Sequence, residues 1–260
     1  MLNKRITKPL IVTLTTVASF LIAYKLKSQS ISAQTAINPF VAHGVVTEYP
    51  PTGTKRAVES RKRTYGRKSD GSWVVINEIR TPSGEVGDVW GFGDGVTGMV
   101  VGIFSHLKSV TTEFFPVPAV LSMNTYSCPP DINSPTAEHK VMLGYDVVKI
   151  TEEDSGPGEM KEVDVSWVAP RLGCYPLRRS EVWSDGAHNE TEVRDVVEGD
   201  PPHWMFEVPA GYVEQSPKQR ASAYEEKYGQ PYYPPSEASR KVLERQEKCY
   251  NESHKRPAEK

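Results

Sequence analysis

The chain of 260 residues is 38% hydrophobic and 25% charged, which is the composition of an ordinary globular protein. Its 21 prolines and 19 glycines favour short strands and turns over long helices. The charge is uneven, because residues 37–216 carry 16 basic and 26 acidic groups. This acidic stretch argues against non-specific binding of nucleic acid, so no nucleic-acid partner is expected.

Residues 1–36 have the pattern of a leader. Lys4, Arg5 and Lys8 precede an uncharged run, PLIVTLTTVASFLIAY, over residues 9–24. As a helix this run would be about 24 Å long, between the core of a signal peptide and a full membrane span. A cleaved signal peptide and an uncleaved N-terminal membrane anchor both fit. Either one predicts an extracytoplasmic protein, periplasmic or secreted, and the uncleaved form would attach it to the membrane through this segment.

The next segments predict an antiparallel meander. Residues 40–49 form a first strand candidate, and residues 57–68 form a second one that is polar and charged. Asp70-Gly71 is a hairpin turn signal, and residues 72–80, SWVVINEIR, follow as a strand rich in β-branched residues.

A basic run lies within the charged strand. A phosphate or anionic-lipid contact is one interpretation of this run. A solvated edge strand, whose charges prevent pairing with another chain, is the other. Its members are Lys55, Arg56, Arg61, Lys62, Arg63, Arg67 and Lys68.

Residues 96–110 predict a helix. Apolar residues recur there at every third or fourth position, and Asp94 is a candidate N-cap. Gly98, Gly102 and the β-branched residues weaken this pattern. Its apolar stripe is expected to pack into the core.

The second half of the domain has a clearer β pattern. Residues 140–150 predict one strand with Val141, Leu143 and Tyr145 on one face. In residues 160–168, apolar Val163, Val165 and Trp167 alternate with polar residues, as in a half-buried strand. Further strands are predicted over residues 175–183, 190–197 and 204–208.

The composition changes after residue 215. We therefore expect one antiparallel β domain over residues 37–216 and a polar, mobile tail over residues 217–260. Ser236 can cap a short helix through Lys248, which has little apolar face to bury.

No motif for catalysis is present. The sequence lacks a nucleophile elbow, a P-loop and a dinucleotide-binding glycine pattern, so we expect no enzyme activity and no cofactor. The three cysteines have no histidine at ligand spacing, so no metal site is expected. In an oxidising compartment Cys128 and Cys174 can form a disulfide, with Cys249 left over, although spacing alone does not establish the pair.

From about residue 40 to residue 215 the chain resembles the LolA-like superfamily of exported bacterial proteins, which includes lipoprotein carriers and sensors of the RseB type. The resemblance rests on the order of elements and on four phrases: RKRTYGRKSDGSWVVINEIR, KVMLGYDVVKI, VDVSWVAPRLGCYPLRR and GDPPHWMFEVPAGYVEQSP. It implies a mainly β (α+β) fold, with an antiparallel sheet curved as a half-barrel around one or more helices. It also implies an apolar concave face, which holds acyl chains in the carriers.

Two hypotheses follow for function. The first is an exported envelope protein that binds a lipid or another apolar ligand, such as an acyl chain, in the concave face. The alternative is a non-catalytic interaction or sensor protein of the envelope, with a protein partner and no bound ligand. The candidate lining residues, each of which can equally be ordinary core, are Trp73, Val75, Val141, Leu143, Tyr145, Val163, Val165 and Trp167.

Overall fold

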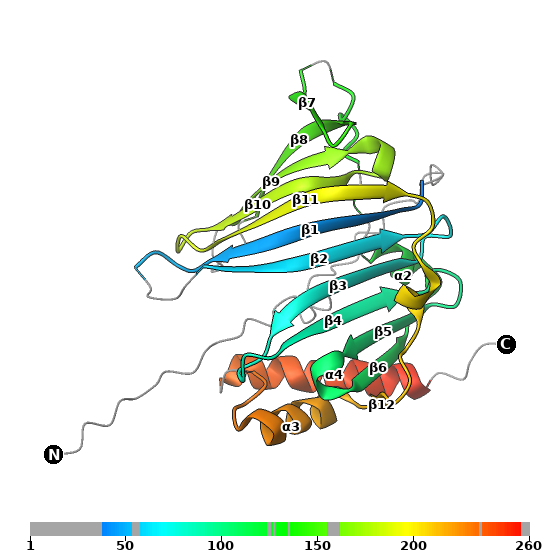
Figure 1. The fold of residues 1–260 in the computed structure, drawn as a ribbon, viewed down its shortest axis with the longest axis vertical. Helices are drawn as coiled ribbons and strands as arrows, with labels where there is room; N and C mark the ends of the chain where they lie inside the picture. Colours follow the sequence, from blue (N-terminus) through cyan, green and yellow to red (C-terminus); the bar gives the residue numbers. More distant parts are fainter. Residues whose placement is uncertain are drawn as a thin grey trace.

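The computed structural model describes residues 38–53, 58–123, 126, 128–134, 136–154, 162–233 and 236–255. These residues form one open, curved sheet of twelve strands with a few helices, a half-barrel (Figure 1). The strand order is β12-β6-β5-β4-β3-β2-β1-β11-β10-β9-β8-β7. All neighbours are antiparallel except β12, which runs parallel to β6. The expected fold class is confirmed.

The strands are β1 Phe40–Tyr49, β2 Glu59–Arg67, β3 Trp73–Arg80, β4 Val86–Gly93, β5 Met99–Phe104, β6 Ser109–Phe114, β7 His139–Met142, β8 Tyr145–Asp154, β9 Glu162–Ala169, β10 Tyr175–Trp183, β11 His188–Glu198 and β12 Val213–Glu214. The α-helices are α2 Val117–Ser122, α3 Pro217–Tyr228 and α4 Glu237–Lys255. Single 3-10 turns are η2 Ser105–Leu107, η3 Pro170–Leu172 and η4 His203–Phe206.

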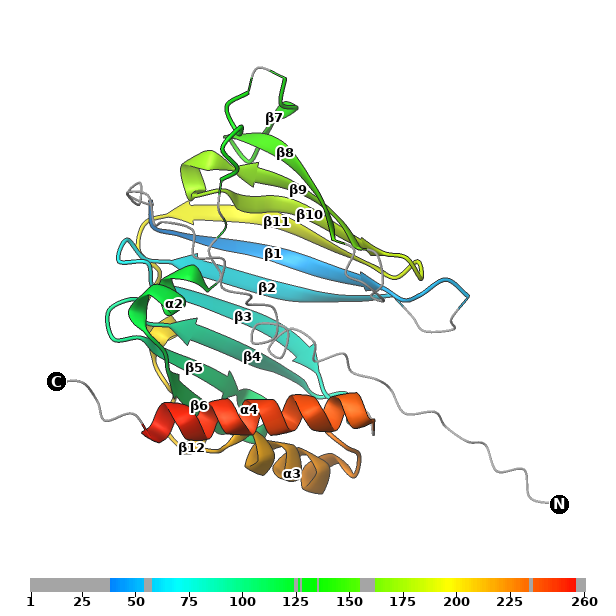
Figure 2. The same cartoon turned by 180° about the vertical axis from the view of Figure 1, so that it is seen from behind.

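The two faces of the sheet are covered by different parts of the chain. Helices α2 and α4 lie on the face that is turned to the viewer in Figure 2, which we call the inner face. Trp73 of β3 points to this face, because its indole nitrogen donates to the Val120 carbonyl of α2 at 3.1 Å. The segment between β11 and β12 covers the opposite, outer face, where Met205 and Phe206 pack on Phe92 and its neighbours.

Most strand predictions agree with the structure because their residues alternate between the two faces. Val75 and Asn77 share the inner face with Trp73, whereas Val74 and Ile76 lie on the outer face. Both faces of β3 are therefore covered, and the strand is a nearly continuous apolar run. Strands β1 and β10 coincide with the predicted residues 40–49 and 175–183.

The helix expected over residues 96–110 is wrong, because this segment forms β5, η2 and β6. Asp94 caps a turn instead of a helix, and its carboxylate accepts from the backbone N–H groups of Val96 and Thr97. Val100 packs on the inner side and Val101 on the outer side of the sheet. A strand buried on both faces has an unbroken apolar sequence, and periodicity alone does not separate such a run from a helix.

The single strand expected over residues 140–150 is a hairpin of β7 and β8. Met142 pairs with Tyr145, so Leu143-Gly144 is a two-residue turn. Both turn residues have positive φ, 51° and 81°, as the tight turn of a hairpin requires. Leucine is unusual at such a position, so the sequence carried no turn signal here. Likewise, residues 204–208 contain η4 where a short strand was expected.

Residues 217–255 are mostly helical. Ser216 caps α3 in a reciprocal capping box with Gln219. Ser236 accepts from the Ser239 N–H at the start of α4, which extends beyond the predicted Lys248 to Lys255. Both helices contact the β6 end of the sheet.

Cys128 and Cys174 form a disulfide that ties the loop before β7 to the start of β10. Cys249 of α4 is a free thiol. The predicted leader, residues 1–36, lies outside the described residues. Among the residues that are described, no helix is long and apolar enough to cross a membrane.

Candidate ligand-binding face

Two glycines leave part of the inner face without side chains. Gly91 of β4 pairs with Val75 on one side and with Gly102 of β5 on the other. A Cβ at Gly102 would meet only ring atoms of Phe104, at 3.5 and 3.8 Å, among the described residues. Val75, Gly91 and Gly102 thus form a low apolar row across three strands, which we call the glycine strip.

Larger side chains stand on both sides of the glycine strip. Trp73 and Val100 belong to the row on one side, where the Trp73 ring lies directly over Gly93. Phe104 belongs to the row on the other side and packs with Ile79 and Val89. The two glycines of the strip are therefore lower than the rows on either side, one of which also contains the buried amide of Asn77. Val75 is 3% exposed, so the uncovered part of the strip is at Gly91 and Gly102.

The part of the inner face around β1 and β10 is filled by aromatic rings. Phe40, Tyr65, Tyr126 and Tyr175 form the aromatic cluster, in which Tyr65 and Tyr175 stack with centroids 4.5 Å apart. Burial raises the pKa of both stacked tyrosines well above the usual range. These hydroxyls stay neutral at all ordinary pH values, so the cluster is core.

A charged cluster adjoins the aromatic cluster. Arg179 of β10 pairs with Asp164 of β9 at 2.5 Å and with Glu181 at 2.9 Å. Burial raises the pKa of Glu181, while Arg179 opposes this rise. The side chains are less than one-third exposed, so removal of one partner would leave a desolvated charge. The inner face is therefore only partly apolar, unlike the uniformly apolar surface that the family resemblance implies.

Polar groups connect the helices to β6. Arg220 of α3 is 5% exposed, donates to the Thr111 hydroxyl at 2.7 Å and lies 4.1 Å from the Phe104 ring centroid. Glu113 is 7% exposed beside it, and burial raises its pKa to about 7 against the opposing charges of Arg220 and His254. From α4, Gln246 and Ser253 are buried. We call this contact the polar seam.

His106 lies at one end of the polar seam. It is 4% exposed, and its ring contacts Phe104, Tyr224 and Tyr228. Burial first, and then the charges of Lys227 and Arg220, lower its pKa to about 4. The imidazole is therefore neutral near pH 7 and fills an aromatic niche.

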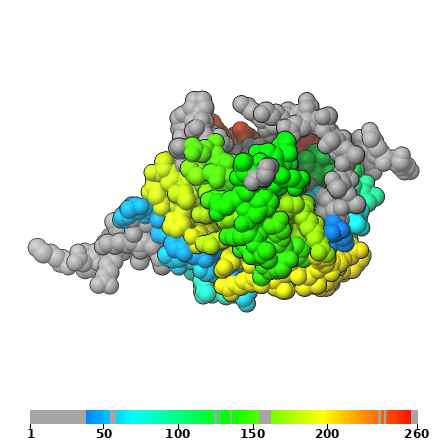
Figure 3. Space-filling view, turned by 90° about the horizontal axis from the view of Figure 1, so that it is seen from above, coloured from blue at the N-terminus to red at the C-terminus, as the bar shows by residue number. Residues whose placement is uncertain are grey.

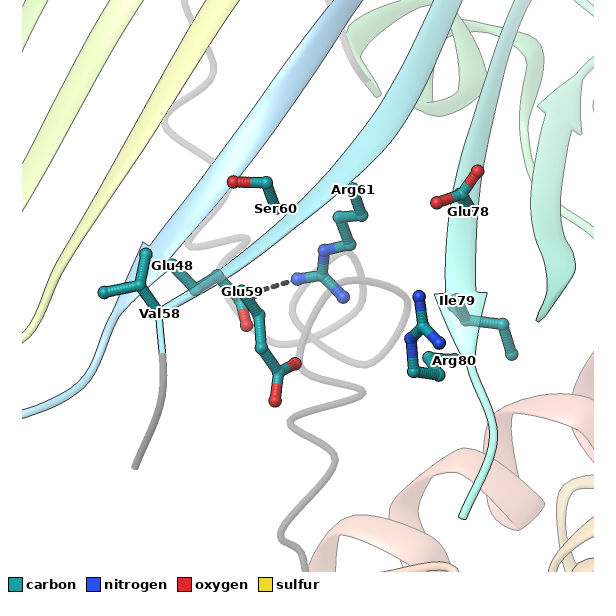
Figure 4. A pocket seen from close by; sticks show the side chains of 8 residues that line it. All are labelled: Glu48, Val58, Glu59, Ser60, Arg61, Glu78, Ile79 and Arg80. Carbon is teal, nitrogen blue, oxygen red and sulfur yellow. Dashed lines mark hydrogen bonds and ion pairs between the residues drawn. The ribbon is translucent and has the colours of Figure 1, made fainter. Parts of the chain in front are cut away.

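A cleft separates the ends of β2 and β3. The pairing of these strands runs only from Arg63 with Asn77 to Arg67 with Trp73. Beyond Arg63, residues 59–62 pair with β1 alone, and residues 78–80 pair with β4 alone. The space between them has a volume of about 260 Å³ and is shown in Figure 4. Its lining residues are Glu48, Val58, Glu59, Ser60, Arg61, Glu78, Ile79 and Arg80.

Of the two interpretations of the basic run, the solvated edge strand is wrong for the sheet as a whole. Strand β2 lies between β1 and β3. Only its first four residues lack a neighbour on the β3 side. Lys62 is 84% exposed there, and Arg61 forms an ion pair with Glu48 across the pair with β1. The charged residues that predicted an edge strand therefore lie partly at the cleft, where β2 has no neighbour on one side.

The structure brings only half of the eight predicted lining residues to one apolar cluster: Trp73 and Val75 belong to it, and Tyr145 and Trp167 pack against it. Trp73 and Val75 are buried on β3, and Val75 belongs to the glycine strip. Strand β9, which carries half-buried Val163, Val165 and Trp167, is five strands away, about 24 Å along the sheet.

The other predicted residues are on the β7–β8 hairpin, at the end of the molecule that faces the viewer in Figure 3. Val141 is 74% and Leu143 44% exposed there, while Tyr145 donates to Glu198 at 2.9 Å. Trp167 lies beneath Lys140, whose ammonium is 3.5 Å from the ring centroid.

The sequence interpretation missed the two site glycines and the cleft. Gly102 was counted as a weak point of a helix, and Gly91 was not named among the candidate residues. The spacing of Gly91 and Gly102 carries no signal by itself, because only the register of β4 with β5 makes them opposite. In the described part of the chain, no group of three or more His, Cys, Asp or Glu side chains could hold a metal ion.

Comparison with family models and with curated proteins finds no match. Among solved structures, a LolA superfamily protein from Nitrosomonas europaea is similar over 67% of this chain and 92% of its own, with 10% identity and a TM-score of 0.34. LprF from Mycobacterium bovis is similar over 67% and 90%, with 11% identity and a TM-score of 0.34. The lipoprotein LppX from Mycobacterium tuberculosis is similar over 66% of this chain and 90% of its own, with 10% identity and a TM-score of 0.32. The superfamily that the sequence resembles is thus among the structures found.

Proposed function

We propose that this protein is an exported, non-catalytic binding protein, which holds an acyl chain of a lipid or another apolar ligand on its inner face. The glycine strip is the observation that carries the proposal. An apolar floor between raised rows of side chains can accept a flexible chain, whose burial contributes about 0.8 kcal/mol per methylene. The leader supports the extracytoplasmic location, and its cleavage or retention decides whether the protein stays attached to the membrane.

The test is to fill the glycine strip. Gly102 has no positive φ, and a Cβ there would meet the Phe104 ring at ordinary contact distances among the described residues. Gly102→Leu should therefore fold at least as stably as the natural chain, since glycine within a strand costs about 0.5–1 kcal/mol. It should nevertheless reduce uptake of a fluorescent fatty acid at least tenfold, with Gly102→Ala giving a smaller loss. Fluorescence titration and urea unfolding of the full chain measure the two effects.

A direct measurement of the ligand complements this test. The full chain, exported by a bacterial host, would be examined by native mass spectrometry and then extracted with organic solvent. Co-purified phospholipid or fatty acid, absent from Gly102→Leu, supports the proposal. A clean mass without ligand, together with no uptake of added fatty acid, would contradict it.

One observation favours the second function, an interaction or sensor protein of the envelope. The aromatic cluster fills the β1 and β10 part of the inner face, so that part has no room for a ligand. A clean mass without ligand would make this alternative the leading one.

A further inference from the structure

The cleft between β2 and β3 opens through the sheet. Residues alternate between the faces along each strand, and Arg63 pairs with Asn77. Glu59, Arg61 and Ile79 therefore belong to the inner face, whereas Glu78 and Arg80 belong to the outer face. Because all of them line one cavity, the cleft connects the inner face with the surroundings of the outer face.

The inner face of β3 joins the cleft to the glycine strip. On β3, Ile79 lines the cleft and Val75 belongs to the strip, four residues or about 13 Å apart. Ile79 packs with Val89 and Phe104, and the Phe104 ring lies beside Gly102. On the same face, buried Asn77 lies between Val75 and Ile79, with Arg63 of β2 beside it. An extended chain on the strip would therefore pass this amide and the neighbouring arginine on its way to the cleft.

The cleft itself carries both signs of charge. Figure 4 shows that Arg61 extends from β2 and Arg80 from β3 into the gap. Arg61 is paired with Glu48, but exposed Arg80 forms no ion pair with the described residues. An exposed guanidinium without an ion-pair partner can donate two parallel hydrogen bonds to a phosphate.

Two acidic residues, Glu78 and Asp88, share the outer face with Arg80. Glu78 forms a weak ion pair with exposed Lys62, with 3.9 Å between the ammonium nitrogen and the carboxylate oxygen. Its neighbour on β4 is Asp88, whose pKa is raised by burial first and by the charge of Glu78 second. A ligand ammonium could replace the exposed Lys62 ammonium and relieve the repulsion between these carboxylates.

We propose that the β2–β3 cleft is a subsite for a zwitterionic phosphate–amine headgroup of an amphipathic lipid whose acyl chain lies on the glycine strip. Arg80 binds the phosphate, and Glu78 binds the ammonium. This inference rests on the proposed function and adds the class of headgroup. The volume of about 260 Å³ suits a small headgroup rather than a whole lipid.

The test uses three soluble probes on the full chain: dihexanoyl phosphatidylethanolamine, lauric acid and O-phosphoethanolamine. Arg80→Gln and Glu78→Gln should each weaken binding of the phosphatidylethanolamine about tenfold, because each removes a charge-assisted contact. Lauric acid binding should stay unchanged in both variants. Arg178→Gln and Glu192→Gln, exposed positions on β10 and β11, are the matched controls and should change nothing.

The possible failures are distinct. If neither lipid probe binds the natural chain, the proposed function fails. If both bind but Arg80→Gln and Glu78→Gln leave the affinities unchanged, the headgroup subsite is wrong while the acyl site stands. If O-phosphoethanolamine binds as tightly as the lipid, the cleft takes a free small zwitterion, and the lipid assignment is overturned.

Discussion

Replacing Trp73 by alanine is expected to lower the free energy of unfolding by about 3–5 kcal/mol. Trp73 is 5% exposed, its ring lies on Gly93, and its indole N–H holds the Val120 carbonyl of α2. The substitution would leave a cavity under α2 and an unpaired carbonyl. Urea unfolding followed by circular dichroism measures the loss.

Trp167 provides the comparison for this experiment. It is half-buried, and its ring carries the Lys140 ammonium on one side. Trp167→Ala should therefore cost only about 1–2 kcal/mol, from partial burial and one cation–π contact. Equal losses for the two tryptophans would contradict the placement of Trp73 in the core and of Trp167 at its margin.

The second large effect concerns pH and the polar seam. The pKa of Glu113 is raised to about 7, so the folded chain keeps a proton that the unfolded chain releases above about pH 4.5. The stability from Glu113 is present at low pH and is lost as the pH rises from about 4.5 to 7. The change is about 3 kcal/mol, at 1.4 kcal/mol for each pKa unit.

His106 has the opposite effect. Its pKa is lowered to about 4, so its contribution is present above about pH 6.5 and is lost as the pH falls to 4. Between about pH 4.5 and 6.5 the contributions of Glu113 and His106 to the free energy of unfolding change in opposite directions and nearly cancel. We expect Glu113→Gln to lose stability relative to the natural chain as the pH falls from 6.5, and His106→Phe to lose it as the pH rises from 4.5.

Urea unfolding at pH 4, 5.5 and 7.5 checks this prediction, with each variant compared to the natural chain at the same pH. The comparison removes the titration of distant groups. The neighbours Arg220, Lys227 and His254 are unchanged in both variants. A pH-independent difference for Glu113→Gln would show that its carboxyl is not desolvated in the folded state.

The sheet was predictable from sequence where each strand carries its own pattern. The hairpin from β2 to β3 was found because Asp70-Gly71 is a turn signal, and Asp70 accepts from the Ser72 N–H as such turns require. The hairpin of β7 and β8 was missed, because Leu143-Gly144 has none of the usual turn residues at the first position. Strand β5 was mistaken for a helix, because both of its faces are buried.

The candidate site was less predictable, because it depends on pairs of residues that are distant in sequence. Val75 was named, but Gly91 and Gly102 matter only through their register. Exposed Val141 and Leu143 were named because they are apolar, although they are on a hairpin beyond the inner face. The charges of β2 led to the prediction of an edge strand, and the first four residues of β2 do lack a neighbour on the β3 side.

The position of β1 also governs how the molecule can fold. This first strand lies in the middle of the sheet, between β2 and β11, so Phe40 pairs with Glu198 near the far end of the domain. The meander from β1 to β6 can form early, but one edge of β1 stays open until β11 arrives. Such long-range closure is slow, and the open edge is prone to intermolecular pairing meanwhile. A newly made chain thus carries a central strand with one unpaired edge until its last long strand is available.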